Sequence, residues 1–204
     1  MEHCNHCRRV VQEPVLCSAC HLAVYCNDEC AEHDWFLHAQ EHDDDYENLM
    51  DLVVGSGRKG EASVYLGSVD ALYDPNALDH IDAVVSALGE NYDNASIRRL
   101  VGRERFHLRV TLWDEPNANI AQDFDRVADW IHEQVIWDRH VLVHCVAGHS
   151  RSTTFLLYYM LKYEGFASVD TALEHVQSRR PTAHPNRGFM KQLRKAAKNM
   201  QIVK

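Results

Sequence analysis

The chain has 204 residues, of which 46% are hydrophobic, and its formal net charge is −9. This composition allows a buried core and excludes wholesale disorder. No apolar run approaches the length of about 18 residues that a membrane span needs, so no membrane partner is expected. The first ten residues, MEHCNHCRRV, lack the apolar stretch of a signal peptide, so we expect an intracellular protein, in the cytoplasm, the nucleus or both.

Paired cysteines and histidines dominate the first 42 residues. Six of the seven cysteines lie within residues 1–30, and two histidines follow at i, i+4 spacing. In a chain that is not secreted, such clustered pairs indicate metal binding rather than disulfides. Eight ligands are enough for two tetrahedral zinc ions with every position filled by protein, so we predict two structural Zn2+ ions and no cofactor for catalysis. The candidate ligands are Cys4, Cys7, Cys17, Cys20, Cys26, Cys30, His38 and His42.

The same segment resembles the MYND zinc-finger family over residues 4–42. The resemblance is carried by the spacing of the pairs, by Tyr-Cys at 25–26 and by Asp-Trp-x2-His at 34–38. MYND fingers usually end on cysteine, whereas this chain has His42, which is an acceptable zinc ligand. The resemblance implies a module that binds short proline-containing peptides of partner proteins. It also implies interleaved metal sites, with Cys4, Cys7, Cys26 and Cys30 on one ion and Cys17, Cys20, His38 and His42 on the other.

Charged residues are distributed along the chain as unevenly as the cysteines are. Residues 1–51 carry 12 acidic and 2 basic side chains, a net charge of −10, whereas residues 52–204 have a net charge of +1. An acidic N-terminal part argues against binding to nucleic acid. The run GSGRKG at 55–60 has the composition of a flexible hinge. We therefore predict a finger with an acidic linker over residues 1–54 and a catalytic domain over residues 55–204.

Strand and helix patterns alternate through the second domain. Strands are predicted over residues 63–67 and over residues 106–112, where apolar side chains alternate. Residues 74–75, Asp-Pro, are a typical helix start, and apolar residues at helical spacing extend the predicted helix to Gly89. Residues 120–135 show the same helical spacing. The apolar positions of the two helices are Leu78, Ile81, Val85, Leu88, Ile120, Phe124, Val127, Ile131 and Val135.

A short apolar strand is predicted over residues 141–143, followed by helices over 152–164, 168–180 and 186–200. Strands that alternate with helices predict an α/β fold, in which a mostly parallel sheet is flanked by helices. The end of the chain is basic, a pattern typical of a solvated helix face, with phosphate or acid binding as the alternative. The basic residues are Arg179, Arg180, Arg187, Lys191, Arg194, Lys195 and Lys198.

The segment that joins the strand at 141–143 to the next helix carries the chemistry. Its order is His144–Cys145, five residues, and then Arg151 at the start of an apolar helix. A loop that tightens into a helix start directs backbone N–H groups at one point, where they and the helix dipole favour an anion. Together with His144, the five intervening residues would form a phosphate-binding loop. They are Val146, Ala147, Gly148, His149 and Ser150.

Several members of this segment suit phosphoryl transfer. Gly148 lets the backbone approach a ligand closely, and Arg151 offers a planar fork for two phosphate oxygens. The field that attracts phosphate also stabilises the thiolate of Cys145, to which Ser152 can donate a hydrogen bond. An anion cradle, a thiolate and an arginine together predict transfer through a cysteinyl-phosphate. The alternative is a buried structural cysteine in front of an ordinary helix.

These residues resemble the signature of the protein tyrosine phosphatase superfamily, His-Cys-x5-Arg-Ser/Thr. The variant at 144–152 is similar to that of the dual-specificity branch, and Arg-Pro at 180–181 with Pro-Asn at 185–186 resembles the C-terminal helix of that branch. The resemblance spans residues 60–204 and implies a protein tyrosine phosphatase-like fold. The domain is short compared with the tyrosine-specific branch of the superfamily. The resemblance therefore implies a shallow pocket that accepts phosphotyrosine and phosphoserine/threonine of phosphoproteins. The middle of the loop lacks the lysines of phosphoinositide-directed loops, which argues against a lipid substrate.

A general acid is also needed, because the leaving oxygen of a phosphoester departs poorly unless it is protonated. Asp114 follows the strand predicted at 106–112 and lies 31 residues before Cys145, a position that matches the acid-loop aspartate of the family. The resemblance gives Asp114 two roles, acid toward the leaving oxygen and then base toward the water that hydrolyses the cysteinyl-phosphate. A loop aspartate that caps residues 117–119 is the alternative, and Glu115 is the second candidate acid.

The combined interpretation is a phosphoprotein phosphatase joined to a peptide-binding zinc finger. Three alternatives stay open at this point. One is a phosphatase for RNA 5′ ends, as in related Cys-x5-Arg enzymes, which the basic C-terminus allows and the acidic finger opposes. Another is a phosphate-binding adaptor with little turnover. In the third, the finger carries the main function and the phosphatase-like domain is a dimerisation scaffold.

Overall fold

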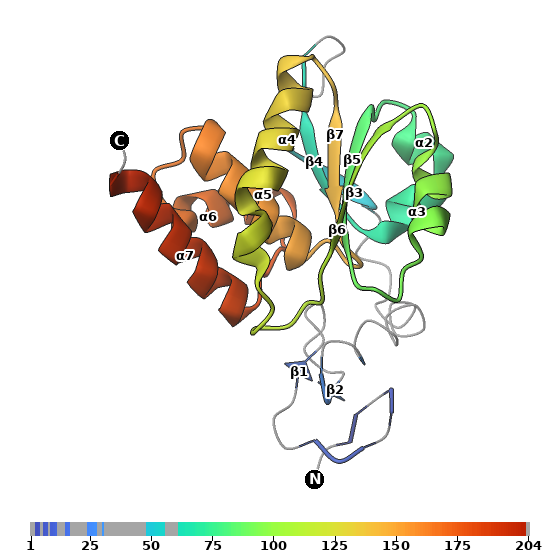
Figure 1. The fold of residues 1–204 in the computed structure, drawn as a ribbon, viewed down its shortest axis with the longest axis vertical. Helices are drawn as coiled ribbons and strands as arrows, with labels where there is room; N and C mark the ends of the chain where they lie inside the picture. Colours follow the sequence, from blue (N-terminus) through green and yellow to red (C-terminus); the bar gives the residue numbers. More distant parts are fainter. Residues whose placement is uncertain are drawn as a thin grey trace.

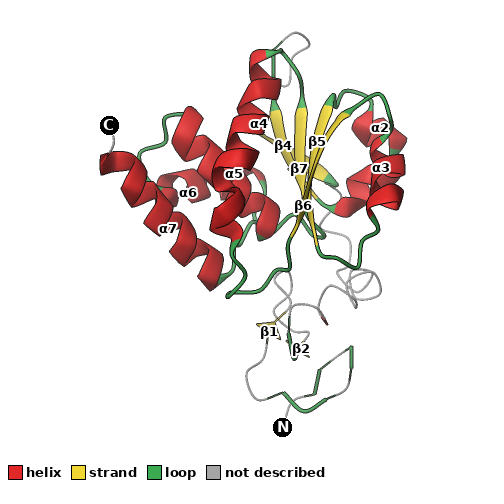
Figure 2. Ribbon diagram, viewed as in Figure 1, coloured by secondary structure: helices red, strands yellow, loops and turns green. Residues whose placement is uncertain are grey.

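A five-stranded sheet forms the centre of the larger part of the chain (Figures 1 and 2). The structure is a computed structural model that describes residues 3–4, 6–7, 9–11, 15–16, 24–27, 30, 48–55 and 61–202. The strands are β3 (Met50–Val54), β4 (Val64–Gly67), β5 (Ala83–Leu88), β6 (Phe106–Thr111) and β7 (Val141–His144). Their order in the sheet is β3-β4-β7-β5-β6, with β3 antiparallel to β4 and every other pair parallel. The predicted α/β class with a mostly parallel sheet is confirmed.

Helices cover both faces of the sheet (Figure 1). One face carries α2 (Pro75–Leu78) and α3 (Asn94–Val101), preceded by a 3-10 turn at Val69–Tyr73. The other face carries α4 (Phe124–Ile136), α5 (Arg151–Tyr163), α6 (Val169–Arg179) and α7 (Arg187–Ile202). These four helices agree with the predicted ones to within a few residues, because their apolar residues recur at helical spacing, and α6 also has a serine cap and a proline just after its end.

Alternation along the central strands gives each face its own hydrophobic cluster. In β5, Val84 and Leu88 pack toward α2 and α3, whereas Val85 and Ala87 pack toward the four-helix side. Successive side chains of a strand point to opposite faces, so a strand covered on both sides reads as a continuous apolar run. Helix α5 lies at the centre of the four-helix side, and 11 of its 13 residues are buried. The start of this helix is therefore held rigidly against β7.

The prediction of one helix over residues 74–89 is wrong. Helix α2 ends at Leu78, and the apolar run Ala83–Leu88 is β5, which pairs with both β6 and β7. All six residues of β5 are buried, and a short run that is buried on both faces does not distinguish strand from helix by its period. Helix α3 was not predicted, although Asp93 caps its start by accepting a hydrogen bond from the backbone of Ser96 at 2.8 Å.

The segment just before the glycine-containing run at 55–60 forms a strand. Residues 50–54, which the sequence assigned to an acidic linker, are β3 at the edge of the sheet. Met50 pairs with Gly67 and Val54 pairs with Val64, with an irregularity between Leu52 and Val54. The division of the chain at residue 55 stays a prediction, but this strand places residues 50–54 in the same sheet as β7.

The N-terminal part contains a short antiparallel pair, β1 (Val15–Leu16) and β2 (Val24–Tyr25). Tyr25 and Cys4 are both buried, at 1% and 0% exposure. Among the helices in the described part of the chain, none combines the length and the hydrophobicity that a bilayer crossing requires.

Candidate functional site

The predicted phosphate-binding loop joins the end of β7 to the start of α5. Its turning point is Gly148, which has a φ of +73°, a conformation that side chains other than glycine rarely adopt. A β-carbon at this position would lie 2.5 Å from the carbonyl oxygen of Gly67. The tight approach of the loop to β4 therefore needs glycine here.

The sulfur of Cys145 lies inside this loop and accepts two hydrogen bonds. The donors are the backbone nitrogen of Gly148 and Oγ of Ser152, each 3.2 Å from Sγ. The side chain is buried next to the N-terminal end of α5, where the helix dipole favours negative charge. Both donors and the helix end stabilise a thiolate. A structural cysteine enclosed by apolar groups would have neither donor.

Asp114 and Arg151 meet beside the loop. Asp114 Oδ1 accepts hydrogen bonds from Ser150 Oγ at 2.6 Å and from Asn186 Nδ2 at 2.7 Å. Asp114 Oδ2 lies 3.5 Å from Arg151 Nε. Arg151 is buried, and its Nη1 donates to the carbonyl oxygen of Leu112 at 3.2 Å. The structure thus brings together three of the residues that the sequence selected, from two segments that lie far apart in the chain.

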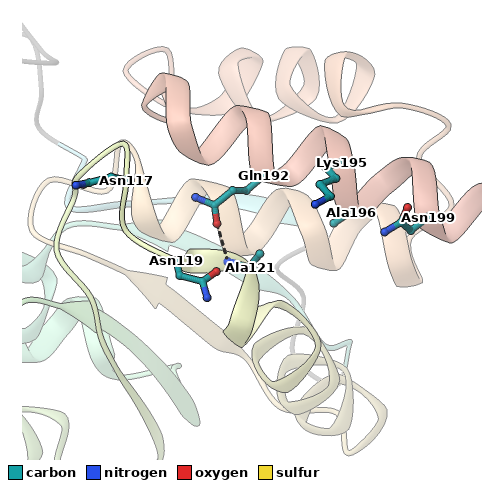
Figure 3. Close-up of a pocket in the computed structure, with 7 residues that line it drawn as sticks. All are labelled: Asn117, Asn119, Ala121, Gln192, Lys195, Ala196 and Asn199. Carbon is teal, nitrogen blue, oxygen red and sulfur yellow. Dashed lines mark hydrogen bonds between the residues drawn. The ribbon is translucent and has the colours of Figure 1, made fainter.

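Helix α7 fixes the segment that carries Asp114. Asn186, directly before the helix, donates to the aspartate, and a β-carbon on Gly188 would overlap the carbonyl oxygen of Pro116. Gln192 accepts from the backbone of Ala121 at 3.1 Å and donates to the carbonyl oxygen of Ala118 at 2.8 Å; Figure 3 shows the first of these bonds. The carboxylate of Asp114 thus reaches across to the phosphate-binding loop, and residues 114–121 are held against α7.

A surface pocket lies beside the contact between residues 114–121 and α7 (Figure 3). Amide side chains and one lysine make most of its lining, and none of the predicted catalytic residues contributes to it. The pocket is therefore separate from the phosphate-binding loop. Its lining residues are Asn117, Asn119, Ala121, Gln192, Lys195, Ala196 and Asn199.

A buried hydrogen-bond chain positions His144 next to Cys145. His144 is fully buried, and its Nδ1 lies 3.1 Å from the carbonyl oxygen of Cys145. Because a carbonyl oxygen only accepts, Nδ1 is the donor, and Nε2 accepts from Ser86 Oγ at 2.7 Å. His107 Nε2 lies 2.9 Å from the same hydroxyl. Ser86 and His107 were not predicted as site residues, because they lie on β5 and β6 and only the sheet register brings them next to His144.

Burial of the two histidines makes the stability of the folded protein sensitive to acid. It lowers the pKa of His144 to about 3 and the pKa of His107 to about 4, where the charges of Arg98 and Arg109 add to the effect. Both histidines are neutral in the folded protein at pH values where unfolded histidine, with a pKa of about 6.5, binds a proton. Below about pH 6.5 the unfolded state therefore binds more protons than the folded state. The stability that the two neutral histidines contribute is fully present above that pH, and it falls as the pH drops toward their pKa values in the folded protein.

We expect the free energy of unfolding to be lower at about pH 5.5 than at about pH 7.5, with about 1 kcal/mol of the difference due to His144 alone. Urea unfolding at the two pH values measures it. Replacing His107 by asparagine should make the difference smaller, because one of the two neutral histidines is gone. An identical difference in this variant would show that His107 binds its proton equally in both states.

Arg180 is an exception to the expected solvated basic face. The other six residues of that run are exposed, whereas Arg180 is 1% exposed and lies against the phosphate-binding loop. Its Nε donates to the carbonyl oxygen of Gly148 at 3.2 Å and its Nη2 donates to that of Ala147 at 2.9 Å. The sequence signal that could have separated Arg180 from its neighbours is its position directly before Pro181, after the last turn of α6.

Four cysteines of the N-terminal segment converge. The sulfurs of Cys4, Cys7, Cys26 and Cys30 all lie within 4.8 Å of one another, and two of the pairs, Cys26 with Cys30 and Cys7 with Cys26, are 3.4 and 3.6 Å apart. A tetrahedral zinc with Zn–S bonds of about 2.3 Å holds its sulfurs about 3.8 Å apart, so this group fits zinc. It is the first of the two ligand sets that the MYND resemblance implies. The second set, Cys17, Cys20, His38 and His42, lies outside the described residues.

Comparison with known proteins agrees with this geometry. The family model for the catalytic domain of dual specificity phosphatases matches residues 64–199, and the MYND finger model matches residues 4–42. Dual specificity protein phosphatase 1 of Arabidopsis thaliana is 37% identical over 147 residues, which cover 70% of this chain and 69% of that protein. Human protein phosphatase Slingshot homolog 3 is 45% identical over 92 residues, which cover 44% of this chain but 14% of that much longer protein.

The solved structures give the same fold. The crystal structure of human DUSP28 superposes with a TM-score of 0.66 at 23% identity and covers 76% of this chain and 97% of that one. The catalytic-domain model covers more than half of this chain, and Cys145 lies in the loop between β7 and α5. The chain therefore belongs to the dual specificity phosphatase family of cysteine-dependent phosphatases, and Cys145 is its catalytic cysteine.

Proposed function

We propose that this enzyme hydrolyses phosphotyrosine and phosphoserine/threonine in proteins through a cysteinyl-phosphate on Cys145, while its zinc finger recruits protein partners. The observation that carries the proposal is the sulfur of Cys145, which sits in a closed loop with two donors at 3.2 Å. The loop ends at an arginine and faces an aspartate from another segment. The phosphate-binding residues are His144, Val146, Ala147, Gly148, His149 and Ser150.

In the first step the thiolate of Cys145 attacks phosphorus, and the bond from phosphorus to the leaving oxygen breaks. Arg151 binds two of the non-bridging oxygens, and the loop N–H groups bind the charge that these oxygens carry in the transition state. Asp114 gives its proton to the leaving oxygen, so the product departs as an alcohol or a phenol. The phosphoryl group is then on sulfur, and Asp114 is ionised.

In the second step Asp114 takes a proton from water, and the oxygen of this water attacks the phosphorus of the cysteinyl-phosphate. The S–P bond breaks, inorganic phosphate forms, and Cys145 returns to the thiolate that Ser152 stabilises by its hydrogen bond of 3.2 Å. Asp114 ends the cycle protonated again. No step needs a metal ion.

The two oxygens of Asp114 have different surroundings, which suggests which one carries the proton. Oδ1 accepts from both Ser150 and Asn186, whereas Oδ2 lies on the side of Arg151. Two donors on Oδ1 leave Oδ2 as the oxygen that gives up and takes back the proton. Because Arg151 also binds the phosphate, Oδ2 lies on the substrate side of the carboxyl group.

The substrate class can be tested with matched phosphoesters. We expect the full chain to hydrolyse peptides that carry phosphotyrosine or phosphothreonine, measured by phosphate release, at rates well above those on a 5′-triphosphate RNA. Faster turnover of the RNA would favour the RNA 5′-phosphatase reading. Phosphopeptide binding without measurable turnover would favour the adaptor.

The finger is proposed as an intracellular recruitment module with two structural zinc ions. Cys4, Cys7, Cys26 and Cys30 would hold one ion, and Cys17, Cys20, His38 and His42 would hold the other. Zinc would supply most of the folding free energy of so short a segment. Selection of the substrate protein would then come from a proline-containing peptide bound by the finger, and the loop would act on the phosphoester brought to it.

Elemental analysis of the purified full chain should find about two zinc ions per chain. Replacing Cys4 and Cys26 together by serine should reduce this to about one, because both belong to one proposed site. A Cys145→Ser chain provides the control and should keep two ions. A zinc content near zero in protein prepared without chelator would contradict the finger, and an unchanged content in the double variant would contradict the proposed grouping.

A further inference from the structure

Hydrogen bonds from Arg180 hold the outer side of the phosphate-binding loop, in addition to the contacts that the loop makes where it enters α5. Arg180 lies on the side of the loop away from Cys145 and donates to two consecutive carbonyl oxygens, those of Ala147 and Gly148. In a cradle whose N–H groups point inward, the carbonyl groups point outward and need donors if they are buried. Arg180 supplies these donors from a side chain that is 1% exposed.

Peptide geometry links these contacts to the nucleophile. The carbonyl of Ala147 and the N–H of Gly148 belong to one planar trans peptide, so they point in opposite directions. Arg180 Nη2 holds the carbonyl end at 2.9 Å, and the N–H end donates to Cys145 Sγ at 3.2 Å. Glycine has little steric resistance to rotation of the adjoining peptides. An external donor on the carbonyl therefore keeps this N–H directed at the sulfur.

The guanidinium is positioned in turn by the strand that follows the finger segment. Arg180 Nη1 donates to the carboxylate of Asp51 at 2.8 Å and to the carbonyl oxygen of Asn48 at 3.2 Å. The Asp51 side chain is 10% exposed, so this ion pair is shielded from water. Asp51 lies on β3, outside the span of the catalytic-domain model, which begins at residue 64.

We infer that Asp51 and Arg180 form a positioning pair that keeps the Ala147–Gly148 peptide turned so that its N–H serves Cys145 and the bound phosphate. The inference rests on the proposed function, and it makes residues 48–54 part of the machinery that shapes the phosphate-binding loop. Neither side chain touches the reacting atoms. A lysine at position 180 would supply a single ammonium in place of the planar fork that serves Asp51 and both carbonyls.

A second contact of β3 provides a matched control. His175 Nε2 lies 2.8 Å from the carbonyl oxygen of Val53, so it also ties β3 to α6 but does not touch the loop. His175→Ala therefore removes a tether of the same strand without removing a contact of the loop. Asp51→Asn removes the charge that orients Arg180 and keeps the size of the side chain.

The experiment compares the full-length wild type with Asp51→Asn, Arg180→Lys, their double variant and His175→Ala. Hydrolysis of p-nitrophenyl phosphate, inhibition by orthovanadate and the rate of Cys145 alkylation by iodoacetamide at about pH 6 are measured, with thermal unfolding in parallel. We expect Asp51→Asn to lower kcat/KM about 10²-fold, the scale of a misplacement of about 1 Å. Vanadate inhibition should weaken about tenfold and alkylation should slow, because one donor to the bound oxyanion and to the sulfur is lost.

The double variant should lose no more than the worse single variant, because both changes break one chain of contacts. His175→Ala should keep kcat/KM and the vanadate constant within about twofold even where its melting temperature falls, because it removes no contact of the loop. The value of kcat/KM is calculated per active site, so that unfolded protein is not counted as lost activity. A folded Asp51→Asn enzyme with a wild-type vanadate constant and a wild-type alkylation rate would overturn the inference. If Asp51→Asn does not fold, the same criteria apply to Arg180→Lys, which keeps a positive charge but lacks the fork that holds the carbonyl groups of Ala147 and Gly148.

The two hypotheses fail in different ways. A wild-type enzyme that hydrolyses no phosphoester would contradict the proposed function, whereas the rate of Cys145 alkylation would still measure the effect of Asp51 on the loop. An active wild type with an unaffected Asp51→Asn variant would contradict the positioning pair alone.

Discussion

Cys145→Ser should lower the turnover of every phosphoester by about 10⁴-fold or more while phosphopeptide binding persists. The proposed mechanism places both bond changes at this sulfur, which is the attacking group in the first step and the leaving group in the second. The serine hydroxyl has the same neighbours, but no base lies among the hydrogen-bond partners found for the sulfur, which are Gly148 N and Ser152 Oγ. The loop N–H groups and Arg151 remain, so the phosphate still has its binding site.

Ser152→Ala is the graded control for this prediction. It removes one of the two donors to the sulfur and leaves the nucleophile, so we expect a loss of about 10- to 100-fold, mainly in the step where sulfur leaves phosphorus. Turnover is measured by phosphate release under saturating substrate, and binding is measured by fluorescence anisotropy of a labelled phosphopeptide. A Cys145→Ser enzyme that keeps near wild-type turnover would remove the cysteinyl-phosphate from the mechanism.

The parts of the fold that the sequence predicted well are those in which several local signals agree. Helix α6 has a serine cap with a reciprocal hydrogen bond to Thr171 and ends before a proline, and its predicted and observed bounds are nearly the same. Strand β6 is asymmetric in its sequence, because apolar and polar side chains alternate along it. Strand β5 has no such asymmetry, since it is buried on both faces, and its apolar run fits the second half of a helix as well as it fits a strand.

The residues of the site also differ in how far local sequence predicts them. Cys145, Arg151 and Ser152 lie within eight residues of one another, so one loop and one helix start are enough to predict their convergence. Asp114 required the spacing of a resemblance, because nothing local says that it will meet Ser150.

The remaining partners depend on tertiary contacts over long separations. Arg180 reaches Asp51 across 129 residues, and Gln192 reaches Ala121 across 71. Charge and composition describe Arg180 as one more exposed cation in a basic run, and only the packing of α6 against β3 shows it as a buried donor to the loop. Such residues follow from how elements pack, which a single sequence does not specify.

Asp114→Asn should lower kcat by about 10²- to 10³-fold for tyrosyl and alkyl phosphates, and by much less for a substrate such as p-nitrophenyl phosphate, whose leaving group departs without a proton. Asparagine keeps an oxygen for Ser150 at the place where Oδ1 accepts at 2.6 Å, so the loop should stay in position. What is lost is the proton on the side of Arg151. The difference between the two substrate classes therefore measures general-acid catalysis apart from any change in phosphate binding.

Glu115→Gln is the matched control, because Glu115 is the adjacent carboxylate and the second candidate acid. It should leave both substrate classes within about twofold of wild type, as expected for a surface change without a catalytic role. Equal losses on good and poor leaving groups in Asp114→Asn would show that Asp114 acts by holding Ser150 and Arg151 in place. A leaving-group-dependent loss in Glu115→Gln instead would transfer the acid role to Glu115. The selective loss in Asp114→Asn alone identifies the carboxyl group held by Asn186 as the proton donor.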